Sequence, residues 1–162
     1  MPAMPVVLAI ETSAHIGAVA LLDSARPEAA IGEVVGDDHK LAGWLLPAIG
    51  RLLQRAGPSA PAIDAIAFGA GPGSFTGVRT ACATAQALAF GWQKPLLAVD
   101  SLQALAMQAA GDAAHATIAV ALDARMGEVY VASFAADGTS GAASLQRLSA
   151  TTVQRPDAVR LP

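Results

Sequence analysis

Short apolar runs separated by turn residues fill the first third of the chain. Residues 5–13 (PVVLAIETS) predict a buried strand that ends at Glu11-Thr12-Ser13. Residues 16–23 (IGAVALLD) predict a second strand, close enough to the first to form a hairpin. Residues 29–36 (AAIGEVVG) predict a third. The chain therefore opens with three consecutive strands.

The pattern then alternates between helices and strands. Residues 37–57 predict a helix with Asp37 or Asp38 as N-cap and Gly57 just past its end, and Pro47 either kinks this helix or marks its true start. Further elements are a strand within 62–71, a helix ending near Gly91, a strand at 95–100, a helix from Ser101, strands at 116–123 and 127–135, and one further strand within 143–152. This order predicts a mixed α/β fold with a central sheet.

Two hairpins follow the same plan. An apolar strand, a carboxylate at its end, a tight glycine-containing turn and a second apolar strand occur around Glu11 and again around Asp123. We interpret them as two copies of one unit, the second incomplete, with a first β-β-β-α-β-α unit at residues 1–100 and a connecting helix and partial second unit at 101–162. The alternative is that two alternating hairpins resemble each other by chance.

Composition narrows the class of protein. The chain has 162 residues, 54% hydrophobic and 14% charged, which is enough apolar material for a folded core. Its net charge of −3 gives no basic field, so an RNA role would need a partner that supplies positive charge. Cys82 is the only cysteine, which excludes an internal disulfide and fits a reducing compartment. There is no signal-peptide pattern and no long apolar run, so we expect a cytoplasmic protein without a membrane span.

Residues 68–90 (FGAGPGSFTGVRTACATAQALAF) form a glycine-rich loop followed by a helix. The loop lacks the lysine of a Walker A motif and has Ser74 where a dinucleotide fingerprint needs glycine. Gly71, Gly73 and Gly77 permit positive φ and close backbone approach, and Ser74 or Thr76 can cap a helix whose first amides favour an anion. A tight strand-to-helix turn without a ligand explains the loop equally well.

The helix at residues 37–57 and the helix after the glycine loop have patterns that predict an interface. On a helical wheel the apolar residues of the first helix span an arc wider than one-sided burial needs. Residues 80–89 (TACATAQALA) are nearly all small, which lets another helix approach closely. Together they could form half of an intermolecular four-helix bundle. The alternative is that the chain's own second half covers them.

Four motifs in order resemble the TsaB family, the bacterial tRNA threonylcarbamoyladenosine biosynthesis proteins also called YeaZ-like. They are LAIETS (8–13), LLPAIGRLL (45–53), GPGSFTGVR (71–79) and ALDARMGEVY (121–130). The resemblance implies an actin-like ATPase (ribonuclease H-like) fold. Family members usually run longer than this chain.

The resemblance also implies a function. TsaB is a noncatalytic scaffold subunit that binds its paralogue TsaD and, with TsaE and the TsaC-type enzyme, supports threonylcarbamoyl modification of the adenosine beside the tRNA anticodon. It can self-associate as a homodimer, needs no cofactor, and would meet tRNA only through the complex. The two metal-binding histidines of TsaD align with Ser101 and Leu105, which cannot replace imidazole.

Two enzymatic alternatives stay open. One is an actin-like ATPase or phosphotransferase, and the other, which the missing histidine pair disfavours, is a metallopeptidase. The residues predicted for a vestigial nucleotide site, with weak binding at a subunit interface, are Glu11, Gly71, Gly73, Ser74 and Asp123. The residues predicted for the partner interface are His39, Leu41, Leu45, Leu46, Ile49, Thr76, Arg79, Thr80, Ala83 and Ala87.

Overall fold

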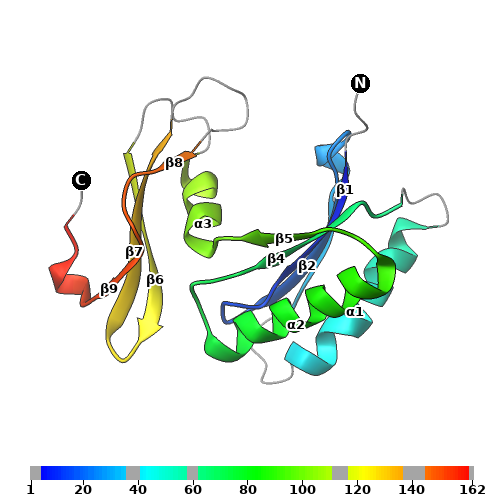
Figure 1. Ribbon diagram of the computed structural model, residues 1–162, viewed down its shortest axis with the longest axis horizontal. Coiled ribbons are helices and arrows are strands. Elements are labelled where there is room, and N and C mark those ends of the chain that lie inside the picture. The colour runs from blue at the N-terminus through cyan, green and yellow to red at the C-terminus, as the bar shows by residue number, and fades with distance from the viewer. Residues whose placement is uncertain (1–4, 36–40, 58–61, 111–116, 137–144, 161–162) are drawn as a thin grey trace. The chain divides into compact units, whose positions relative to one another are not determined.

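The computed structural model describes residues 5–35, 41–57, 62–110, 117–136 and 145–160 (Figure 1). They group into two compact units, residues 1–70 with 74–99 and residues 71–73 with 100–162. Within the described ranges, no helix is both long and apolar enough to cross a membrane.

The first unit contains a five-stranded mixed sheet with the order β3-β2-β1-β4-β5. Strands β1 and β2 form the predicted antiparallel hairpin, β3 pairs antiparallel with β2, and β4 and β5 run parallel to β1. The bounds are β1 Val6–Glu11, β2 Gly17–Asp23, β3 Ile31–Val35, β4 Ala65–Gly69 and β5 Leu96–Val99. A short 3-10 helix, η1 (Pro27–Ala29), separates β2 from β3. The order of strands and helices along the chain that the sequence predicted for this unit is confirmed.

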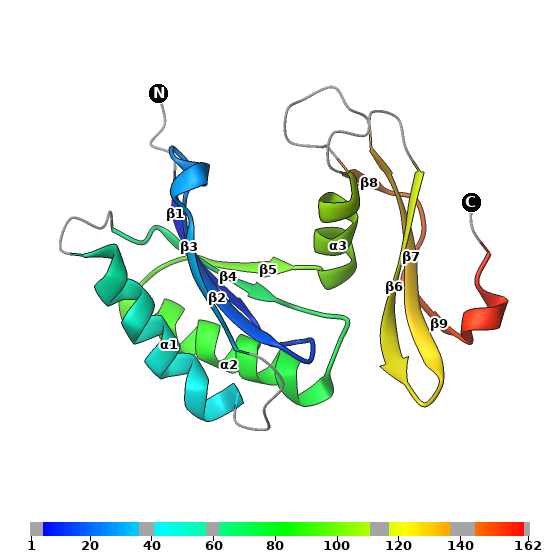
Figure 2. The same ribbon diagram turned by 180° about the vertical axis from the view of Figure 1, so that it is seen from behind.

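Two helices, α1 (Leu41–Ala56) and α2 (Phe75–Trp92), lie against one face of this sheet (Figures 1 and 2). Alternate residues of β1 point into the core, which is why Val6, Leu8 and Ile10 are buried. Pro47 lies inside α1 and does not mark its start. The helices contribute the following side chains to the core: Leu45, Ala48, Ile49 and Leu52 from α1, and Ala81, Ala85 and Ala89 from α2.

The second unit holds α3 (Ser101–Ala110) and a smaller antiparallel sheet. Its strands are β6 Thr117–Arg125, β7 Glu128–Ala136, β8 Leu145–Arg147 and β9 Thr152–Gln154, and the 3-10 helix η2 (Pro156–Ala158) follows. Strand β7 pairs with β6 and also with β8 and β9, two strands where the sequence predicted one. A small core containing Leu102, Ala106 and Phe134 joins α3 to the sheet.

One polar cluster connects α3 to β8 within the second unit. The Asp100 carboxylate accepts a hydrogen bond from the Gln103 amide at 2.9 Å, which caps the helix. The same carboxylate pairs with Arg147 at 2.7 Å, and the Arg147 guanidinium lies 4.7 Å from the centre of the Phe134 ring. These contacts fix the start of α3.

Candidate functional site

The glycine loop connects the end of β4 to the start of α2. Ser74 is the N-cap of α2, and its hydroxyl accepts a hydrogen bond from the Gly77 amide at 3.3 Å. This confirms one of the two capping predictions. Gly71 has a φ of +86°, so it is the residue of the loop that takes the left-handed conformation. Gly73, for which the sequence also permitted a positive φ, does not take that conformation.

Hydrogen bonds connect the start of α2 to the two residues that follow β1. The Ser74 amide donates to the Ser13 carbonyl at 2.6 Å. The Thr12 side chain is fully buried, and its hydroxyl donates to the Gly77 carbonyl at 2.7 Å. A Cβ at Gly77 would overlap the Thr12 carbonyl oxygen, so glycine is required here by close backbone approach. The approach predicted at Gly77 is therefore confirmed, and the backbone that approaches is that of Thr12, the residue after β1.

Glu11 is also engaged within the chain. Its carboxylate accepts a hydrogen bond from the Ser13 amide and lies against Gly69, the last residue of β4. A Cβ at Gly69 would overlap this carboxylate. We call the six residues Glu11, Thr12, Ser13, Gly69, Ser74 and Gly77 the strand–helix joint. In this joint the polar groups expected to face a nucleotide have partners from the protein itself.

Asp123 has a position in its hairpin similar to that of Glu11. Glu11 pairs with Ala18 in the last register pair of β1 and β2, and Asp123 pairs with Val129 just before a register shift. Asp123 is exposed and accepts a hydrogen bond from the Arg125 amide at 2.7 Å. Its carboxylate also forms an ion pair of 3.5 Å with the Arg125 side chain. The similar placement supports the interpretation of two related hairpins.

The predicted nucleotide-site residues fall in both compact units. Glu11 and Ser74 belong to the first, whereas Gly71, Gly73 and Asp123 are grouped with the second. Across the described ranges, His, Cys, Asp and Glu side chains form no group of three or more that could hold a metal ion. The vestigial nucleotide site stays a prediction. Of its residues, Glu11 and Ser74 lie near each other in the first unit, because both are hydrogen-bonded to Ser13.

The predicted interface on α1 needs a correction. Leu45 and Ile49 were assigned to the partner surface, but both side chains are buried in the core of the first unit. That part of the prediction is wrong, because these residues lie on the face of α1 that packs against the sheet. Leu46 is 58% exposed and stays available for contact. His39 lies outside the described residues, as does the side chain of Leu41.

The exposed face of α2 agrees better with the expected positions. Thr76, Arg79, Ala83 and Ala87 are exposed, whereas Thr80 is half-buried and its hydroxyl donates to the Thr76 carbonyl at 2.9 Å. Two large exposed side chains on the same helix were not predicted, Phe75 at 72% and Phe90 at 88% exposure. The signal was present in the spacing, since Phe75 lies four residues before Arg79 and Phe90 seven after Ala83.

These residues form a nearly continuous stripe, which we call the α2 face: Phe75, Thr76, Arg79, Ala83, Ala87 and Phe90. The Arg79 guanidinium lies 3.4 Å from the centre of the Phe75 ring, a cation–π contact that holds both side chains at the start of the helix. Small alanines occupy the middle of the stripe and an aromatic ring stands at each end. Exposed rings around a shallow centre are typical of surfaces that bury apolar area on binding.

Helix α1 is joined to the edge strand β3 by an ion pair. The Arg51 guanidinium contacts the Glu33 carboxylate, and Arg55 donates to the Gly32 carbonyl at 3.1 Å. Hydrogen bonding from Arg51 lowers the pKa of Glu33 below its usual range, and Glu33 in turn raises the pKa of Arg51. This pair is at the surface and attaches the helix to the sheet.

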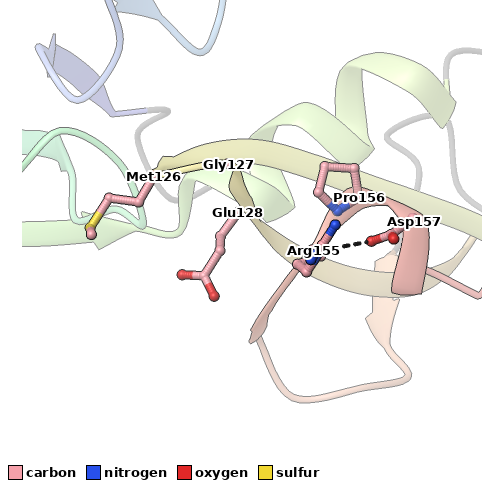
Figure 3. A pocket seen from close by; sticks show the side chains of 6 residues that line it. All are labelled: Met126, Gly127, Glu128, Arg155, Pro156 and Asp157. Atoms are coloured by element: carbon pink, nitrogen blue, oxygen red, sulfur yellow. Dashed lines mark hydrogen bonds and ion pairs between the residues drawn. The ribbon is translucent and has the colours of Figure 1, made fainter.

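A cavity of about 710 Å³ lies beside the β6–β7 turn (Figure 3). Met126 projects from the turn with 97% exposure, and Arg155 pairs with Asp157 at 3.2 Å. Arg125, Met126 and Gly127 all have positive φ, which gives the turn its tight curvature. Glu128 also lines the cavity, so its charged side chains are one cation and two anions.

Comparison with known proteins identifies the family. A family model described as TsaD, tRNA N6-adenosine threonylcarbamoyltransferase, matches residues 33–158. A solved structure described as YeaZ from Pseudomonas aeruginosa superposes with a TM-score of 0.83 at 38% identity, covering 98% of this chain and 71% of that one. The chain belongs to the TsaB (YeaZ) family.

Curated TsaB proteins are similar over the same region. The chain is 42% identical over 124 residues to the tRNA threonylcarbamoyladenosine biosynthesis protein TsaB of Haemophilus influenzae, and 37% identical over 131 residues to that of Escherichia coli. These matches cover 76% and 81% of this chain but 51% and 55% of the two relatives. The chain therefore spans about half the length of the curated TsaB proteins it matches. The match to YeaZ also establishes the actin-like fold expected from the motifs.

Proposed function

We propose that this chain is a noncatalytic, partner-binding subunit in tRNA threonylcarbamoyladenosine biosynthesis. It binds TsaD, and through that complex it acts with TsaE and the TsaC-type enzyme. In isolation it associates with a second copy of itself. It has no cofactor requirement and meets tRNA only through the complex, which agrees with its net charge of −3.

The α2 face is the observation that carries this proposal. Phe75 and Phe90 leave large apolar surfaces in water, and burial of each on binding is favourable by about 25 cal/mol for every Å² removed from solvent. Ala83 and Ala87 between them let a partner helix approach to short interaxial distance. Leu46 of α1 adds an exposed apolar side chain. The face fits an apolar helical surface on the partner.

Two observations support a noncatalytic role. The Glu11 carboxylate, the candidate for holding a metal-bound phosphate, is hydrogen-bonded to the Ser13 amide. Ser101 and Leu105 stand where the resemblance to TsaD would require histidines. The alternative function, an actin-like ATPase or phosphotransferase, would need Glu11 to exchange its internal partner for a hydrated cation.

Co-purification with TsaD from the same organism tests the proposal. Ala83→Trp places a bulky ring in the middle of the α2 face, and Phe90→Ala removes an apolar end, so both variants should lose most of the TsaD retained by the wild type. Ala104→Trp is the matched control, because Ala104 is also an exposed alanine on a helix, but on α3. The proposal fails if the wild type retains no TsaD, or if the control loses as much TsaD as Ala83→Trp.

A further inference from the structure

The strand–helix joint contains two glycines that are required by contacts within the chain. At Gly77 the obstacle to a side chain is the Thr12 carbonyl, and at Gly69 it is the Glu11 carboxylate. The buried Thr12 hydroxyl adds a 2.7 Å hydrogen bond to the Gly77 carbonyl, in the first turn of α2. Backbone and side-chain contacts thus converge on one short stretch of helix.

We propose that the strand–helix joint positions the α2 face for its partner, with Thr12 and Gly77 as the positioning residues. The inference rests on the proposed function, because it concerns the surface through which the partner binds. It assigns to this part of the glycine loop a role in assembly in place of a role in holding phosphate. Neither Thr12 nor Gly77 needs to touch the partner for this role.

The geometry of the helix explains why its first turn matters. The α2 face begins at Phe75, directly after the cap residue Ser74. Helix α2 has 18 residues and is therefore about 27 Å long at 1.5 Å per residue. A tilt of about 5° at the joint would displace the Phe90 end by roughly 2 Å over that length. A displacement of this size would misalign the two aromatic ends of the face.

The rest of α2 contacts the core mainly through small side chains. The residues that α2 buries fully are Ala81, Ala85 and Ala89, together with Gly77 itself, and Cys82 and Leu88 pack against the core while partly buried. Alanines interdigitate weakly with a sheet, because a single methyl group gives no ridge to lock into a groove. Hydrogen bonds and close backbone contacts add to this packing at the first turn, through Thr12, Ser13 and Gly77, and they restrain the direction in which the helix leaves the joint.

Thr12→Val tests the inference, because it keeps the shape of the side chain and removes the hydroxyl. Thr12→Ser is the matched control, since it keeps the hydroxyl and loses a methyl group. If the first turn of α2 then holds the competent orientation one tenth of the time, the apparent dissociation constant for TsaD rises about tenfold. We expect that rise for Thr12→Val and wild-type affinity for Thr12→Ser. Gly77→Ala should weaken binding at least as much.

Amide hydrogen exchange provides the second measurement. We expect faster exchange confined to the first turns of α2 in Thr12→Val, with the rest of the first unit protected as in the wild type. A contribution to stability alone would instead lower the melting temperature and leave the affinity of the folded protein unchanged. If Thr12→Val binds TsaD as tightly as the wild type does, the inference is overturned.

The proposed function and the positioning role of Thr12 can fail separately. If the wild type does not bind TsaD, the proposed function is wrong, and hydrogen exchange still decides whether Thr12 orients α2. Unchanged exchange at the start of α2 in Thr12→Val would overturn the positioning role on its own. Should Gly77→Ala fail to fold, Thr12→Val and Thr12→Ser still give the complete comparison.

Discussion

Two neighbouring leucines of α1, one buried and one exposed, allow the roles of the core and of the interface to be tested separately. Leu45 has no exposed surface and packs in the core of the first unit, whereas Leu46 is 58% exposed. Leu45→Ala removes buried methyl groups and leaves a cavity, which destabilises proteins by about 2–5 kcal/mol. Leu46→Ala removes a side chain that is mostly in water already, so we expect about 0.5 kcal/mol or less.

Urea unfolding monitored by tryptophan fluorescence measures this difference. Both tryptophans, Trp44 and Trp92, lie in the first unit, so their emission reports on the unit that contains the substitutions. With a urea m-value of about 2 kcal/mol/M, a 3 kcal/mol loss would lower the midpoint by about 1.5 M. Light scattering on the same samples measures self-association.

We expect opposite effects of the two substitutions on stability and on self-association. Leu45→Ala should lose stability but keep its association under native conditions, whereas Leu46→Ala should keep its stability and associate more weakly. Equal stability losses would refute the assignment of Leu45 to the core. A folded, stable Leu45→Ala variant that no longer associates would restore the interface first predicted for that residue.

Three further predictions concern metal content and ATP hydrolysis, the contact at Gly69, and the ion pair of Glu33. The purified chain should hold no stoichiometric zinc or iron and should hydrolyse ATP negligibly; metal analysis and a steady-state assay check this, and turnover abolished by Glu11→Ala would contradict it. Gly69→Ala should destabilise the first unit, and combining it with Glu11→Ala should recover part of the loss, because the collision needs both side chains. Because hydrogen bonding from Arg51 lowers the pKa of folded Glu33 below that of an ordinary glutamate, the contribution of Glu33 to stability is present above the ordinary pKa and is lost as the pH falls through the lowered value. The wild type should therefore be more stable than Glu33→Gln at neutral pH, and unfolding measured as the pH is lowered should show this difference disappear. A stability difference that does not change with pH would refute the assignment of the ion pair to Glu33.

The sequence was informative where one local signal determines one local structure. The period-two alternation in residues 6–11 places every second side chain in the core, and Ser74 before an apolar helical run marks a helix start. The repeated hairpin plan around Glu11 and Asp123 also appears in the pairing of the strands. Each of these features depends on residues that are close together along the chain.

The width of the apolar arc on α1 misled the interface prediction. A helical wheel shows which residues share a side of the helix, but it does not show how far the sheet and α2 wrap around that side. Leu45 and Ile49 were therefore assigned to a second, external face although both lie in the core. Phe75 and Phe90 were not predicted because the interface on this helix was inferred from the small residues 80–89, and both rings lie outside that run.

The glycine loop contains contacts that the local sequence cannot identify. A glycine that cannot accept a side chain indicates that another group comes close, but the sequence does not say whether that group is a phosphate or a protein backbone. At Gly77 the approaching group is the Thr12 carbonyl, and at Gly69 it is the Glu11 carboxylate. Thr12 is 65 positions away from Gly77, a long-range contact that only the folded sheet brings about. A motif whose glycines serve contacts of this kind can therefore persist in a subunit that binds a partner, whether or not a nucleotide is ever bound.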